Sequence, residues 1–207
     1  MVGAFHELMV CMACLSSLSA ESMTTFGRSR PDLIYRRATS IRQELLIWWD
    51  AQPPELRDQR NDWRSLPCAK ALDEAGMLEH ESFASIRSCK FACTIYLQHT
   101  ISPLAVHPLG SEVSAAVDDI LSIARNTPEG YGLEMGLLWS IFMAGVAIFG
   151  DAEAEALIRR KLRSDASISI YHADRGLELL EILWERQNRL KVKCDWREIQ
   201  NEMGMQV

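Results

Sequence analysis

The sequence predicts an all-α fold, a single helical domain of about seven or eight helices around a central buried helix. Apolar residues recur at helical spacing in one segment after another. No segment shows a convincing period of two bounded by turns, and none repeats at a fixed interval. With 207 residues, 48% hydrophobic and 24% charged, the chain has the composition of one globular domain that needs neither metal nor disulfides to fold. We therefore expect residues 1–207 to form one domain.

Two helices are predicted in the N-terminal quarter of the chain. The second starts near Pro31, which suits a first helical turn, and Pro53 and Pro54 end it. Each helix carries an apolar stripe. The stripe of the first helix consists of Phe5, Leu8, Met9, Met12, Leu15 and Leu18. The stripe of the second consists of Ile34, Ala38, Ile41, Leu45 and Trp48.

A long loop is expected over 52–82, because this stretch is charged, rich in proline and aperiodic, with one short helix possible over 69–78. Ser82 is suited to cap the next helix, which stops before Pro103. Ser111 caps the helix after that, and a turn beginning at Thr127 ends it.

The segment 133–149 is predicted to be the central element. It is apolar on all sides, with Glu134 as its only charge, and a helix of that kind must be covered all round. Gly136 and Gly145 lower its helix propensity, so they indicate either the close approach of a neighbouring helix or room for a bound molecule.

Three further helices follow the central one. Asp151 begins a helix with an acidic first turn and a basic last turn, the order that complements the helix dipole. The next covers about 175–190. Its inward residues are Leu179, Leu180, Leu183 and Trp184. The last begins at Asp195, which with Glu198 has the spacing of a capping box, and ends at Gly204.

Charge and composition exclude several classes of protein. The chain has 22 basic and 28 acidic residues, a net charge of −6, which argues against direct nucleic-acid binding. The longest uncharged run, 135–149, is shorter than the roughly 20 residues that span a membrane. Six scattered cysteines and the lack of a basic leader indicate a reducing compartment. We therefore expect a nuclear or cytoplasmic protein without a membrane span.

No spacing of residues predicts a catalytic residue, a metal site or a cofactor. Cys11 and Cys14 lack a second ligand pair, and Cys89 and Cys93 share a helix face without further ligands. His172 lies two residues before Asp174, but no nucleophile elbow accompanies it. We therefore expect no enzyme, while a site assembled from distant residues stays open.

The aromatic and methionine residues of the central segment are the candidate ligand-binding set. They are Met135, Trp139, Phe142, Met143 and Phe149. Binding sites of helical proteins lie between helices and are mostly hydrophobic, so an apolar small molecule fits these residues. Plain core packing is the alternative interpretation.

Three stretches carry a resemblance to a known family. The first is 137–145, with Ser140 where relatives often carry proline. The second is 179–185, followed by 195–198 and 202–204. The third is 95–97, preceded by Trp49 and the two prolines. In this order they resemble the fungal-specific transcription factor domain, the C-terminal regulatory domain of fungal zinc-cluster transcription factors.

The resemblance implies a transcription-regulating helical domain. The family's zinc cluster needs six closely spaced cysteines with basic neighbours, which these scattered cysteines do not match. The resemblance therefore implies a regulatory domain, either a whole one or the C-terminal part of a larger family domain. It would act through a protein partner or as a homodimer, through a lipophilic small molecule, or both. A hydrophobic-metabolite binding protein or an enzyme recruited to a fungal secondary-metabolism pathway is the alternative.

Overall fold

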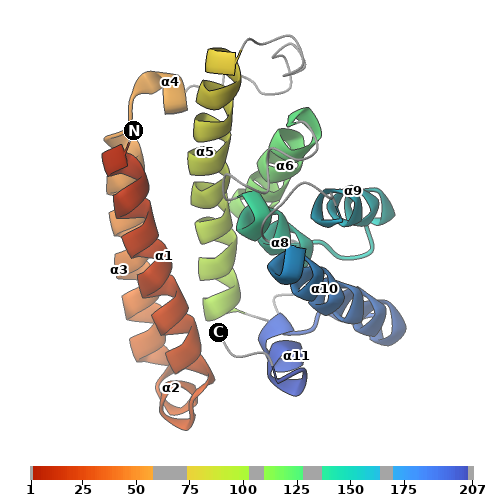
Figure 1. Cartoon of the computed structure of the whole chain (residues 1–207). Helices are drawn as coiled ribbons and strands as arrows, with labels where there is room; N and C mark the ends of the chain where they lie inside the picture. The colour runs from red at the N-terminus through yellow and green to blue at the C-terminus, as the bar shows by residue number, and fades with distance from the viewer. Residues whose placement is uncertain (1, 58–73, 103–109, 128–136, 164–169, 205–207) are drawn as a thin grey trace.

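The structure, a computed structural model, describes residues 2–57, 74–102, 110–127, 137–163 and 170–204, and every secondary-structure element in these ranges is a helix (Figure 1). The helices are α1 (Val2–Met23), α2 (Thr25–Ser29), α3 (Pro31–Asp50), α4 (Pro54–Arg57), α5 (Glu74–Ile101), α6 (Ser111–Asn126), α8 (Leu137–Ala147), α9 (Ala152–Leu162), α10 (Ile170–Leu190) and α11 (Trp196–Glu202). The predicted all-α single domain is confirmed. Among the described helices, none has the length and apolar character to cross a membrane.

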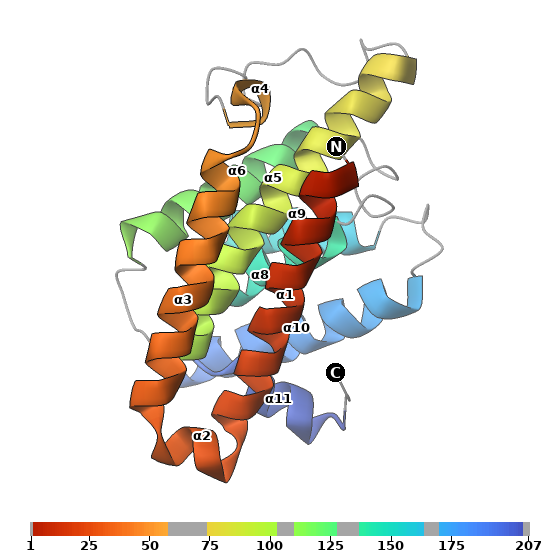
Figure 2. The same cartoon turned by 90° about the vertical axis from the view of Figure 1, so that its left-hand side faces the viewer.

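The helices α1 and α3 form an antiparallel hairpin that the short α2 closes (Figure 2). The Oγ1 of Thr24 accepts a hydrogen bond from the amide of Gly27, 3.0 Å away, which caps α2. An ion pair between Arg37 and Glu21 joins the two long helices. The buried residues of α3 are the five of its predicted stripe. In α1, by contrast, the predicted stripe residue Met9 is 45% exposed, because it lies on the side away from α3 and α5.

The long helix α5 is buried between two groups of helices. It packs against α1 and α3 on one side and against α6 and α8 on the other (Figures 1 and 2). The predicted loop over 52–82 is wrong at both ends, since α4 starts at Pro54 and α5 starts at Glu74. Ser82 lies inside α5, because the helix formers Glu74, Ala75, Met77, Leu78 and Glu79 outweigh Gly76 and extend the helix ahead of it. Residues 58–73 of that loop lie outside the described ranges.

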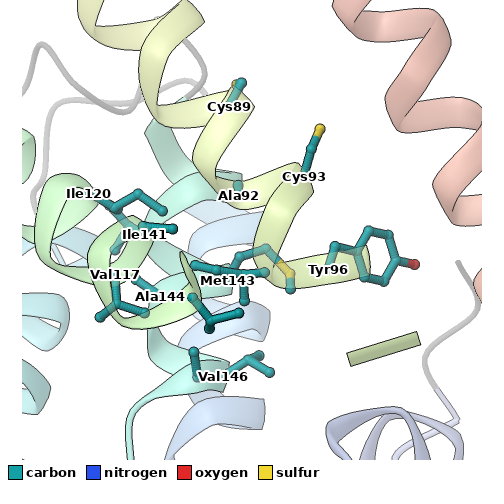
Figure 3. Close-up of a cluster of buried hydrophobic side chains, with 14 of the residues drawn as sticks. Cys89, Ala92, Cys93, Tyr96, Val117, Ile120, Ile141, Met143, Ala144 and Val146 are labelled. Atoms are coloured by element: carbon teal, nitrogen blue, oxygen red, sulfur yellow. The ribbon is translucent and has the colours of Figure 1, made fainter. Parts of the chain in front are cut away.

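The core between α5, α6 and α8 consists of small and branched apolar side chains. Figure 3 shows Val117 and Ile120 of α6 close to Ile141 and Ala144 of α8, while Cys93 of α5 points away from them. The helix α8 packs against α5, α6, α9 and α10, and most of its residues are buried. It ends two residues before Phe149, and the predicted start over 133–136 lies outside the described ranges.

The glycine in α8 permits the close approach of α10. A Cβ atom on Gly145 would lie 2.7 Å from Cδ1 of Leu180, and the indole nitrogen of Trp184 donates a hydrogen bond to the Gly145 carbonyl oxygen at 2.9 Å. Of the two explanations offered for Gly145, the close approach of a helix is therefore the one observed here. Gly136 lies outside the described ranges.

Two helices begin near their predicted caps. Asp151 caps α9, since its Oδ1 accepts from the amide of Ala154 at 3.0 Å. Gly110, not Ser111, is the cap residue of α6, so that predicted cap is wrong by one position. No side-chain hydrogen bond supports the cap at Gly110.

We predict that Gly27→Ala destabilises the fold. The added Cβ would overlap the carbonyl oxygen of Glu21 and lie 2.8 Å from Cα of Ser22, both backbone atoms that cannot rotate away. We expect the free energy of unfolding to fall by about 3 kcal/mol in urea denaturation, the upper part of the range for overpacking. The matched control is Gly110→Ala, where no atom lies within 4 Å of the new Cβ. Equal stability of the two variants would contradict the close contact at Gly27.

Candidate functional site at the junction of the chain ends

The buried guanidinium of Arg197 joins three helices that are far apart in the sequence. Its Nε and Nη2 donate to the carboxylate of Asp195 over distances of 2.8 to 3.2 Å. Its Nη1 donates to the hydroxyl oxygens of Ser19 and Ser22 in α1, at 3.1 and 2.9 Å. Nη2 also points at the main-chain carbonyl of His99 in α5, 3.5 Å away. We call this set of contacts the Arg197 clamp.

The start of α11 positions the Arg197 clamp. Asp195 is the N-cap residue, and its Oδ1 accepts from the backbone amide of Arg197 at 3.0 Å while binding the guanidinium as well. The side chains of Arg197 and Asp195 are 8% and 6% exposed, so this is a buried, bidentate ion pair. The predicted cap residue is confirmed. The Asp195 side chain does not bond the amide of Glu198, however, because that amide donates to the Asp195 main-chain carbonyl.

Two further buried ionisable groups lie beside the Arg197 clamp. Burial and the nearby charge of Lys193 lower the pKa of His99 to about 3, so its imidazole is neutral at pH 7. Its Nδ1 has no hydrogen-bond partner among the described residues. Burial lowers the pKa of Lys193 to about 8, and its ammonium donates to the carbonyl of Ala147 at the end of α8. Residues 193–197 therefore contact α1, α5 and α8.

A cleft of about 240 Å³ opens next to the Arg197 clamp, between α2, α3, the end of α5 and α11. Its lining residues are Ser22, Met23, Gly27, Arg28, Pro31, Ile34, Tyr35, Thr100, Ile101, Asp195, Arg197 and Glu198. One wall is apolar and the α11 wall is charged. We call it the α2–α11 cleft, and its size and mixed lining suit one large side chain or a small amphipathic molecule.

The serine and threonine hydroxyl groups that line the α2–α11 cleft both donate their protons to backbone carbonyls. Ser22 donates to the carbonyl of Ser19 at 2.7 Å, and Thr100 donates to that of Tyr96 at 2.9 Å. Asp195 is engaged by Arg197. A nucleophilic hydroxyl needs a neighbouring base that takes its proton. The proton of each of these two hydroxyls points at a backbone carbonyl, which is not such a base.

The predicted ligand-binding residues of α8 lie elsewhere in the fold. Met143 is fully buried, whereas Trp139 and Phe142 are half-buried. Trp139 packs edge-on against Tyr96 with ring centroids 6.1 Å apart, and Phe142 packs against Trp196 at 5.4 Å.

Tyr96 and Trp196 are themselves 6.0 Å apart, so four rings form one aromatic cluster. Trp139, Phe142, Met143 and Phe149 do not line the α2–α11 cleft. Phe149 is half-buried just beyond α8, and Met135 lies outside the described residues. The structure thus brings Trp139 and Phe142 together in one cluster, with Met143 in the core.

The described cysteines are reduced thiols, and all of them except the exposed Cys14 are buried or half-buried. Burial raises the pKa of Cys89 to about 11, and the hydroxyl of Ser140 donates to its sulfur at 3.7 Å. Burial also raises the pKa of Cys93 well above its ordinary value. Within the described ranges, no group of three or more His, Cys, Asp or Glu side chains could hold a metal ion.

Sequence reasoning did not identify the Arg197 clamp. One signal for it was present: Ser22 follows Leu8, Leu15 and Leu18 at helical spacing, so a polar side chain stands in line with the apolar stripe of α1. A polar group on a buried face needs a hydrogen-bond partner, but the sequence does not indicate that the partner comes from the other end of the chain.

Comparison with known proteins gives one match. A family model described as fungal specific transcription factor domain matches residues 1–207. Searches of curated proteins and of solved structures return no match.

We predict that Arg197→Met destabilises the protein by about 3–5 kcal/mol, because it leaves the Asp195 carboxylate buried and unpaired. Urea denaturation measures this loss. The matched control is Arg186→Met, which breaks the pair between Arg186 and Glu202 on the surface of the same C-terminal region, and we expect almost no change there. Similar losses in the two variants would show that the Arg197 clamp has no special role.

We predict a pH dependence of stability from His99. Its pKa falls from an ordinary 6.5 to about 3 on folding, so the unfolded chain binds more protons between these values. Stability is therefore fully present above pH 6.5 and falls as the pH is lowered toward 3. Between pH 6.5 and 5, urea denaturation should give a slope of up to about 1.4 kcal/mol per pH unit. His99→Leu should flatten that slope and His6→Ala, an exposed control, should not; an unchanged slope in His99→Leu would be inconsistent with a neutral His99.

Proposed function

This chain belongs to the fungal specific transcription factor domain family, and from that premise we propose that it regulates transcription by binding a protein partner, without contacting DNA itself. The match over residues 1–207 is the observation that carries the proposal, since it covers every element of the fold. The net charge of −6 supports the second half, because a domain that tracks phosphates is normally basic.

A nuclear location and the absence of catalysis are part of the same proposal. Regulation of transcription requires the protein to reach the nucleus. Ser22 and Thr100, whose protons are committed to carbonyl oxygens, support binding over reaction at the α2–α11 cleft. The protein partner is either a different chain or a second copy of this one, and light scattering of the purified protein distinguishes the two.

We also propose that regulation can act through a lipophilic ligand bound at α8. The ligand would be an apolar small molecule that contacts Met135, Trp139, Phe142, Met143 and Phe149. The partial exposure of Trp139 and Phe142 favours it, because part of each ring is open to a small molecule from the surface. Native mass spectrometry of the purified chain tests this form: a copurified lipid supports it, and an empty protein that no lipophilic compound stabilises argues against it.

We predict that the chain alters transcription when it is fused to an unrelated DNA-binding domain. In a yeast reporter assay, the fusion should change reporter output severalfold relative to the DNA-binding domain alone at equal abundance. The isolated chain should show no submicromolar affinity for random duplex DNA at low salt. An inert fusion would contradict the regulatory role, and tight DNA binding would contradict a domain that makes no DNA contact.

A further inference from the structure

The rim of the α2–α11 cleft is locally basic, although the chain as a whole is acidic. Segment 25–42 contains one acidic residue, Asp32, and all of its arginines are exposed. Those arginines are Arg28, Arg30, Arg36, Arg37 and Arg42. The positive charge is therefore concentrated on α2 and the first half of α3, which lie at one end of the molecule (Figures 1 and 2).

Acidic partners offset only part of this charge: Glu21 pairs with Arg37 and Glu112 pairs with Arg42, which leaves three arginines near the cleft with Asp32. Asp32 is shared between Arg36, at 2.8 Å, and Arg30, at 3.5 Å, so one carboxylate faces two guanidinium groups. The hydrogen bond from Arg36, with the charge of Arg30, lowers the pKa of Asp32. Arg28, which lines the cleft, makes no ion pair with any residue in the described ranges. A net positive charge thus remains at the cleft entrance, open to an anionic partner.

Exposed aromatic side chains accompany these arginines. Phe26 is 55% exposed and Tyr35 is 58% exposed, and Tyr35 lines the cleft. Behind Tyr35 the cleft wall is apolar, with Met23, Ile34 and Ile101. Aromatic residues and arginine are the types enriched in protein interfaces, where an apolar pocket receives an anchor residue and charged groups surround it.

The apolar lining of the cleft favours a peptide over a nucleic acid. Met23, Ile34 and Ile101 offer contacts to an apolar side chain, which a phosphate chain lacks. Asp195 is paired with Arg197, so the acidic repulsion in the cleft comes from Glu198 on α11, which directs the carboxylates of an occupant toward the arginines of α2 and α3. The occupant that matches both parts has acidic groups outside the cleft and an apolar group within it.

We propose that the α2–α11 cleft and its arginine rim bind a short acidic segment of a partner protein. The segment inserts one bulky apolar side chain between Tyr35 and α11, and its carboxylates contact Arg28, Arg30 and Arg36. This inference rests on the proposed function, because it specifies which surface receives the protein partner and what the partner's chemistry is.

Fluorescence anisotropy tests the proposal with a labelled synthetic peptide of Asp, Glu and Ser around one central Phe. We expect saturable binding by the full chain that weakens as salt is raised, since exposed charges are screened. Replacing the Phe of the peptide with Ser should weaken binding about tenfold, and so should the double variant Arg28→Glu with Arg36→Glu.

The double variant Arg125→Glu with Arg189→Glu is the matched control, since it makes the same charge change at two exposed residues of α6 and α10. It should bind the peptide as the unmodified chain does, and circular dichroism checks that all variants keep their helix content. Tyr35→Ala should weaken binding without reducing its salt dependence, because it removes a wall of the cleft and no charge.

Two results would overturn the inference. One is no peptide binding by the folded chain, and the other is binding of single-stranded or duplex DNA through Arg28 and Arg36 in place of the peptide. The reporter fusion separates this inference from the proposed function: if the fusion regulates transcription but the chain binds no acidic peptide, only the docking site is wrong.

Discussion

One buried charge, the guanidinium of Arg197, holds α11 against the last turns of α1 and α5. Burying an arginine is costly unless its donors are satisfied, and here they reach Asp195, two serine hydroxyls and a main-chain carbonyl. Ser19 stands 178 positions before Arg197 in the sequence. The geometry therefore exists only when α1, α5 and α11 have all docked. The α2–α11 cleft depends on the same arrangement, since Asp195 and Arg197 form one of its walls.

The residues next to Arg197 in the sequence connect α11 to the core. Trp196 joins the aromatic cluster that includes Phe142 of α8 and Tyr96 of α5, while Lys193 reaches the end of α8 through Ala147. A partner that binds only when α11 is docked would stabilise that docking by mass action. Binding in the α2–α11 cleft would therefore favour the docked position of α11, and a regulatory domain could respond to its partner through this coupling.

The sequence predicted the local features of this fold well. The stripe of α3 and the cap at Asp151 follow from helical periodicity and capping chemistry, and both act within a few residues. For Gly145 the sequence allows two explanations, because only the position of Leu180 decides between them. Met9 was misassigned, since a pattern shows which residues are apolar but not which side of a helix has a neighbour.

The site itself could not be derived in this way. The partners of Arg197 are set by tertiary packing across almost the whole chain, and Arg28 gains its significance from the α11 wall opposite it. The resemblance to a family did identify the class of protein, because the order and spacing of short motifs are visible in the sequence, whereas tertiary contacts are not. Neither source of information pointed to the α2–α11 cleft.

Hydrogen–deuterium exchange on the Arg197→Met variant tests the central claim most directly. If Arg197 holds α11 against the end of α1, exchange should accelerate not only in α11 but also in the segment from Ser19 to Gly27, far away in the sequence. Faster exchange confined to α11, with the end of α1 protected as in the unmodified chain, would contradict it.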